Sequence, residues 1–78
     1  MTASEVNHAV VRERFGLPAE QVGSVNDPRT HEEHGVHWNE KWIYPLPDGG
    51  RRIVYWHRYD FRGVLRESSD GSVRKESL

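Results

Sequence analysis

The chain has 78 residues, a length that suits one small domain over residues 1–78. It contains no cysteine, which excludes disulfide bonds and thiolate metal sites, and its net charge is -1. No apolar run approaches the roughly 18 residues of a membrane span, so we expect no contact with a membrane.

The N-terminal segment is predicted to form a helix over about residues 3–15. Thr2 and Glu5 have the spacing of a capping box, in which each side chain satisfies a backbone amide near the other. Apolar residues then recur at helical spacing until Gly16, a residue type that commonly ends helices. The first residues lack the basic and hydrophobic regions of a secretory signal, so we expect a cytoplasmic location.

Residues 23–35 lack hydrophobic periodicity and contain several helix and strand breakers, so they are predicted to form a loop. Three histidines in and beside this loop, His31, His34 and His37, follow a regular three-residue spacing. Imidazole is a ligand that zinc and nickel accept. Gly35 interrupts the helix that would align His31 with His34, and His37 lies at the start of a predicted strand, so we predict no metal and no other cofactor. A His-rich metal-binding protein is kept as an alternative.

Two runs of alternating residues, about 36–46 and 51–66, are predicted to be long strands. Residues 47–50, Pro-Asp-Gly-Gly, form a strong turn signal between them. A second turn signal at residues 69–72 precedes a short third strand. The expected fold is therefore α+β, with the N-terminal helix packed on a three-stranded antiparallel β-meander over about residues 36–76.

The pairing register of the two long strands decides which residues share a face. If Leu46 lies opposite Arg51, most of the large aromatic rings gather on one face and form the core. A three-residue loop with Gly49 as a bulge would shift the pairing by one residue and place tryptophans beside Arg52 and Arg58. We predict the first register because it matches the hydrophobic residues best.

The other face of the predicted sheet is basic. Residues 51–66 contain five arginines against one acidic residue. Guanidinium groups two residues apart suit successive anionic groups, and a tryptophan among them can stack on a base or pack under an arginine. The predicted ligand-binding residues are Lys41, Arg52, Trp56, Arg58 and Arg62.

This basic face predicts a small non-enzymatic binding or adaptor domain that contacts an acidic protein partner. The near-neutral net charge favours a defined protein over nucleic acid, which attracts proteins of high positive charge. A nucleic-acid-binding module that uses the same face is the alternative.

One polar pair is expected within the predicted aromatic face, where Glu40 would face His57 across the two strands. A carboxylate that orients an imidazole is a candidate acid–base pair. No nucleophile, oxyanion hole or cofactor loop accompanies the two residues, so we predict that the chain is not an enzyme. A small enzyme built on this Glu–His pair is a further alternative.

The predicted helix is too short to cover the predicted sheet. A helix of 13 residues spans about 20 Å, whereas a strand of 11 residues spans about 36 Å. Aromatic rings beyond the helix would form an apolar patch, and a symmetric dimer is the commonest way to bury one. We therefore expect a homodimer through Trp38, Tyr59 and Phe61, unless residues 23–35 cover this part of the sheet.

Overall fold

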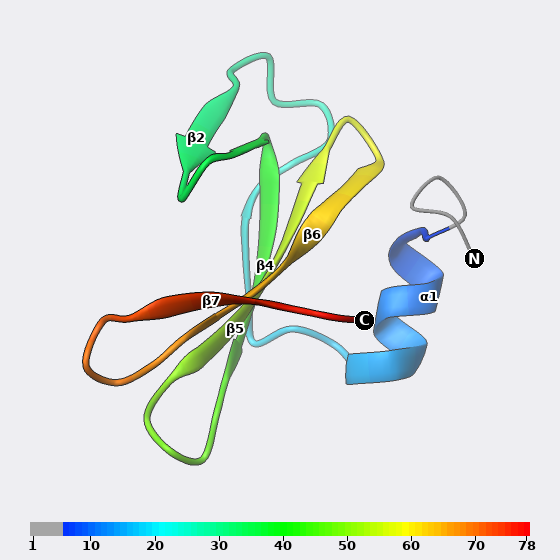
Figure 1. The fold of residues 1–78 in the computed structure, drawn as a ribbon. Helices are drawn as coiled ribbons and strands as arrows, with labels where there is room; N and C mark the ends of the chain where they lie inside the picture. The colour runs from blue at the N-terminus through cyan, green and yellow to red at the C-terminus, as the bar shows by residue number, and fades with distance from the viewer. Residues whose placement is uncertain (1–5) are drawn as a thin grey trace.

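The structure, a computed structural model, describes residues 6–78, which form one short helix and two antiparallel sheets (Figure 1). The larger sheet has five strands in the order β1-β4-β5-β6-β7, and the smaller sheet pairs β2 with β3. The elements in chain order are α1 (His8–Phe15), β1 (Glu20–Gly23), β2 (His31–Glu33), β3 (Val36–Trp38), β4 (Glu40–Pro45), β5 (Arg51–His57), β6 (Asp60–Glu67) and β7 (Val73–Glu76). Within residues 6–78 no helix is long and apolar enough to cross a membrane.

The predicted α+β fold, a helix packed on a three-stranded meander, is wrong. The chain is mostly strand, and each of the two long runs is divided in two. The run 36–46 breaks at Asn39 into β3 and β4, and the run 51–66 reverses direction at residues 58–59 to give β5 and β6. The predicted loop over residues 23–35 contains β2 and the last residue of β1.

The helix α1 is shorter than the predicted helix over residues 3–15. Its N-cap is Asn7, whose side-chain oxygen accepts a hydrogen bond from the backbone N–H of Val10 at 3.0 Å. Its C-terminal end confirms the predicted stop, because Gly16 has a positive φ of 82°. The predicted capping box at residues 2 and 5 lies outside the described residues.

The reversal between β5 and β6 carries no turn signal in the sequence. Arg58 and Tyr59 both have positive φ angles, 52° and 75°, as a two-residue type I′ hairpin turn requires. Asparagine and glycine are the usual residues at such positions, because other side chains adopt them at a steric cost of about 1 kcal/mol each. The tertiary structure holds this turn instead, since the backbone N–H of Arg58 donates to the side-chain oxygen of Asn39 at 3.0 Å.

The predicted register between β4 and β5 is also wrong, by one residue. Ile43 lies opposite Ile53. The backbone N–H of Leu46 donates to the carbonyl of Gly50 at 2.9 Å, which closes a three-residue loop with Gly49 at a φ of 88°. This is the loop that hydrophobic matching had disfavoured. Because side chains alternate along a strand, the shift moves a whole set of residues to the opposite face.

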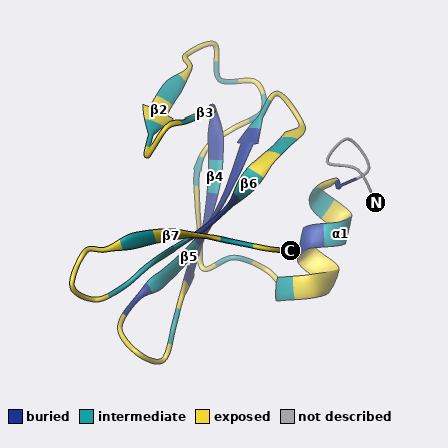
Figure 2. Cartoon of the chain, viewed as in Figure 1, coloured by how far each residue is buried: buried dark blue, intermediate teal, exposed yellow. Residues whose placement is uncertain are grey.

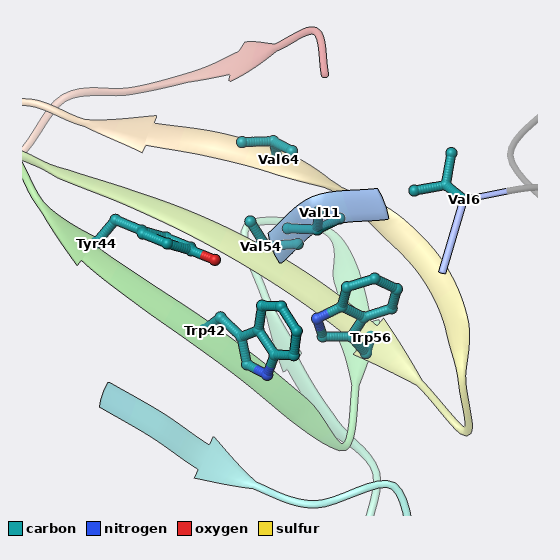
Figure 3. Close-up of a cluster of buried hydrophobic side chains, with 7 residues drawn as sticks. All are labelled: Val6, Val11, Trp42, Tyr44, Val54, Trp56 and Val64. Atoms are coloured by element: carbon teal, nitrogen blue, oxygen red, sulfur yellow. The ribbon is translucent and has the colours of Figure 1, made fainter. Parts of the chain in front are cut away.

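Both faces of the five-stranded sheet carry a hydrophobic core. On the face that α1 covers, the buried residues are Val6, Val11, Trp42, Tyr44, Val54, Trp56 and Val64 (Figure 3). On the other face, the hairpin formed by β2 and β3 supplies Trp38, which packs with Ile53, Tyr55 and Leu65. Buried residues follow β4 and β5 through the middle of the molecule, whereas exposed residues gather at the turns (Figure 2).

This arrangement removes the reason for expecting a homodimer. Trp38 is buried beneath its own hairpin, and Phe61 packs against the core on the helix side. Only Tyr59 of the three is largely exposed, at 64%. The three rings do not form one apolar patch, because residues 31–38 cover the part of the sheet that the helix leaves open. We therefore do not propose a dimer through them.

Asn39 joins several of these elements and is fully buried. Its side-chain nitrogen donates to the carbonyls of Val25 at 3.1 Å and Asp27 at 3.3 Å, while its side-chain oxygen accepts from Arg58. Its backbone N–H donates to the carbonyl of Trp56 at 2.9 Å. One side chain thus fixes the loop after β1 and the turn after β5.

The replacement Asn39→Asp is expected to destabilise the fold by about 3 kcal/mol, because it leaves two partly buried carbonyls without donors and sets a carboxylate against them. Chemical denaturation monitored by tryptophan fluorescence measures this loss. Asn26→Asp in the same loop is the matched control, since Asn26 is exposed, and it should change stability by less than about 0.5 kcal/mol. Equal losses in the two variants would contradict the role given to Asn39.

Candidate functional site

The structure does not bring the five predicted ligand-binding residues onto one face. Trp56 is fully buried beneath α1. Its ring centroid lies 5.3 Å from that of Trp42 and 4.3 Å from that of His8. It therefore has no exposed surface on which a ligand could stack, and its role is in the core.

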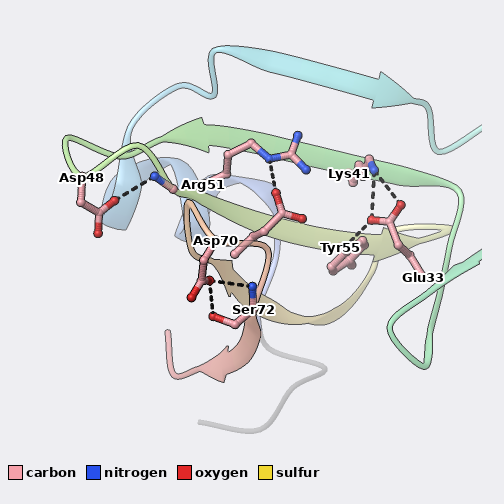
Figure 4. Close-up of polar contacts among 9 residues, drawn as sticks. Glu33, Lys41, Asp48, Arg51, Tyr55, Asp70 and Ser72 are labelled. Carbon is pink, nitrogen blue, oxygen red and sulfur yellow. Dashed lines mark hydrogen bonds and ion pairs between the residues drawn. The ribbon is translucent and has the colours of Figure 1, made fainter.

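Lys41 lies on the opposite face of the sheet from Trp56 and is held by a carboxylate (Figure 4). Its ammonium group donates to both oxygens of Glu33, at 3.0 and 3.1 Å, and sits 4.8 Å from the ring centroid of Trp38. The hydroxyl of Tyr55 also donates to Glu33, at 2.6 Å. These contacts attach the β2–β3 hairpin to the sheet, so we assign Lys41 a structural role.

The ionisation of Glu33 reflects these contacts. Burial raises the pKa of its carboxyl group, but hydrogen bonds from Tyr55 and Lys41 outweigh burial, and the net pKa is lowered. Burial and the neighbouring Glu33 carboxylate together raise the pKa of the Tyr55 hydroxyl, so that group stays protonated and acts as a donor. The cluster is therefore most favourable when Glu33 is charged.

Arg52 and Arg58 also serve the fold. The guanidinium of Arg52 donates to Glu76 at 2.8 Å and lies 4.5 Å from the ring centroid of Phe15, so it links β5, β7 and α1. Arg58 is exposed in the strained turn, where its backbone N–H is bound by Asn39. The side chain of Arg58 projects from the end of the β5–β6 hairpin.

Arg62 is placed differently, because it occupies a β-bulge. Tyr55 lies opposite Gly63 while Trp56 lies opposite Phe61, so Arg62 is the extra residue on β6. Bulges redirect side chains and are common at sheet edges and beside functional sites. Here the bulged arginine is exposed and lines a groove.

This cationic groove lies between the β2–β3 turn and the strands β6 and β7. It consists of a hollow of about 460 Å³ and an adjoining one of about 140 Å³, which share Val36, Arg62 and Lys75. The larger hollow is lined by His34, Gly35, Val36, His37, Phe61, Arg62 and Lys75. The smaller is lined by Val36, Arg62, Gly63, Val64, Leu65, Lys75 and Glu76.

The charges in the cationic groove are largely of one sign. Within residues 6–78, neither Arg62 nor Lys75 forms an ion pair. The acidic lining residue, Glu76, is already engaged by Arg52. Two cations that lack a carboxylate partner are suited to bind an anionic group from outside.

The groove contains residues that the sequence did not assign to the basic face. His34 has a φ of 54° and precedes Gly35, so the two form the tight turn between β2 and β3. A His-Gly pair between strands is a usable turn signal, because both positions need positive φ. Lys75, on β7, lies opposite Leu65 of β6. Because Lys75 follows Val73 by two residues, strand alternation predicts that the two side chains share a face of the sheet.

The three regularly spaced histidines do not converge. His31 stacks on Trp38 with ring centroids 4.7 Å apart, and His37 lies 3.4 Å from Glu32 on the neighbouring strand. His34 is in the turn between them. In the part of the chain that the structure describes, no group of three or more histidine, aspartate or glutamate side chains is placed to hold a metal ion.

The predicted pair of Glu40 and His57 is not formed, because the register places Trp56 opposite Glu40. One oxygen of the buried Glu40 accepts from the indole N–H of Trp42 at 2.8 Å, and the other lies 3.3 Å from Nε2 of His8. His57 instead lies 3.2 Å from the hydroxyl of Thr30. Glu40 therefore connects the sheet with the start of α1.

No protein-family model matches the chain, and no solved structure matches it. Among curated proteins, the chain is similar to the bifunctional protein GlmU of Halorhodospira halophila, with 30% identity over 73 residues. The match covers 94% of this chain but 15% of GlmU, so the chain spans a small part of that relative. A similar segment thus occurs within a longer protein.

Glu33→Gln tests the cluster that anchors the hairpin. Because folding lowers the pKa of Glu33 below its ordinary value of 4.5, its contribution to stability is present above that pH and is lost as pH falls through the lowered pKa. The variant should be less stable than the parent chain at about pH 7, and the difference should shrink towards about pH 3. Denaturation curves at several pH values measure it.

Glu32→Gln is the control for this prediction, because the Glu32 side chain is 62% exposed on the adjacent position of β2. It should alter stability by less than about 0.5 kcal/mol at neutral pH. A difference between Glu33→Gln and the parent chain that stays constant with pH would argue against an ionised Glu33 in the folded state.

Proposed function

We propose that this chain is a small non-catalytic binding domain whose cationic groove holds an acidic segment of a partner protein. The observation that carries the proposal is the pair Arg62 and Lys75, which line both hollows of the groove and have no ion-pair partner within residues 6–78. His34 and His37 line the opposite wall of the larger hollow and can donate hydrogen bonds.

The surroundings of the groove favour an acidic protein segment over a nucleic acid. Glu32 lies opposite His37, Asp60 immediately precedes Phe61, and Glu76 borders the smaller hollow. A long polyanion would meet these carboxylates as well as the cations, and the net charge of the chain is -1. A short acidic stretch matches the limited extent of the cationic groove.

The comparison is compatible with a module of a larger protein. A segment similar to 94% of this chain forms 15% of the bifunctional protein GlmU, so a sequence of this kind is compatible with a larger protein. A domain with a cationic groove, in which the predicted pair of Glu40 and His57 is not formed, suits attachment or positioning. Of the five ligand-binding residues predicted from the sequence, the proposal keeps Arg62. It adds Lys75, His34 and His37, which also line the groove.

The test uses a fluorescein-labelled eight-residue peptide of alternating glutamate and valine, with fluorescence anisotropy as the measurement. Arg62→Ala and Lys75→Ala are each expected to weaken binding about fivefold, the effect of losing one partly exposed charge contact. Binding should also weaken as salt rises, because solvent-exposed charges are screened. No saturable binding up to about 1 mM would overturn the proposal.

Arg74→Ala is the matched control. Arg74 is the exposed neighbour of Lys75 on β7, but strand alternation points it to the opposite face. Its loss should leave the affinity within about twofold. An equal effect of Arg74→Ala and Lys75→Ala would mean that only overall charge matters. Tighter binding of a mixed-sequence oligonucleotide, with a steep salt slope, would favour nucleic acid instead.

A further inference from the structure

The strand β6 has an open outer edge along its first half. On one side, β6 pairs with β5 from residue 60 to residue 67 except at the bulged Arg62, but on the other side β7 pairs only with residues 64–67. Residues 60–63 have no strand partner on that side within residues 6–78, and no turn or loop bond described there reaches their backbone. Backbone donors and acceptors on such an edge are ready to pair with another extended chain.

The end of β7 explains why this edge stays open. The carboxylate of Glu76 is held by Arg52 at 2.8 Å and by Arg66 at 3.7 Å. Leu78 then packs against the core on the helix side, and the C-terminal end lies beside α1 (Figure 1). The chain is thereby drawn away from β6 at the point where a longer β7 would have paired with Gly63.

The open edge and the cationic groove are the same place. Phe61, Arg62 and Gly63 line the groove from β6, and Lys75 lines it from β7. The turn between β2 and β3 forms the opposite wall. A strand that paired with residues 60–63 would therefore lie in the groove, with alternate side chains beside Arg62 and Lys75.

The charges of this edge select its occupant. Arginine and lysine on an edge strand oppose pairing with a basic or identical strand, because like charges would face one another. A second copy of this chain, aligned edge to edge about a twofold axis within residues 60–63, would bring Arg62 close to its own equivalent. An acidic strand instead gains both backbone hydrogen bonds and charge contacts.

We propose, resting on the function proposed above, that the acidic partner segment binds in extended form as an additional antiparallel strand along residues 60–63 of β6. This mode of recognition takes its affinity from main-chain hydrogen bonds and its specificity from alternate side chains. One set of alternate residues presents glutamate to Arg62 and Lys75, and the backbone of the strand bonds to β6.

Alternate N-methylation of the glutamate–valine peptide tests the strand. In a β-strand, every second residue directs its N–H towards the same neighbour, so methylation of the glutamate amides and of the valine amides blocks opposite edges. One methylated peptide should bind about tenfold more weakly than the parent peptide, from the loss of two or more hydrogen bonds, and the other should bind within about threefold of it.

Amide hydrogen exchange gives a second readout on the protein side. Exchange at residues 60–63 should slow when the unmethylated peptide binds, whereas exchange in the 69–72 turn should not change. Strand addition would be overturned if the two methylated peptides had equal effects, or if exchange at residues 60–63 did not change. In that case, binding that depends on Arg62 would still support the proposed function. Failure of the unmethylated peptide to bind would overturn both.

Discussion

The buried side chain of Asn39 is the constraint on which the rest of the structure depends. All of its hydrogen-bonding groups are used: the backbone carbonyl accepts from Ser24 at 3.0 Å, in addition to the contacts described above. A buried polar group costs free energy unless it is satisfied, so these segments must be in place together. Gly23 contributes by its lack of a side chain, since a Cβ there would collide with the Asn39 carbonyl oxygen.

Two small elements cover the two faces of the five-stranded sheet. The helix α1 covers one face, and the β2–β3 hairpin covers the other through Trp38 and the contact of Glu33 with Lys41 and Tyr55. The same hairpin also supplies the turn that forms one wall of the cationic groove. The contacts that anchor the hairpin to the sheet therefore also fix one wall of the candidate site.

Local signals in the sequence predicted two of the turns that contain glycine, but neither the His34–Gly35 turn nor the turn that tertiary contacts impose. The stop at Gly16 and the turn signals at residues 47–50 and 69–72 were correct. The reversal at Arg58 was missed because its left-handed backbone is held by a residue 19 positions away in the chain. Register failed because hydrophobic matching assumed one core, whereas this sheet buries residues on both faces.

The candidate site could be predicted only in part for the same reason. Arg62 was identified from its strand, but its direction comes from a bulge that a single alternating run does not reveal.

The turn between β5 and β6 has a further consequence for the order of folding. A turn formed by two left-handed residues without glycine is held in place by the hydrogen bond to Asn39, so we expect the β5–β6 hairpin to form late. We expect the β4–β5 hairpin, whose loop places Gly49 at the position of positive φ, to pair earlier.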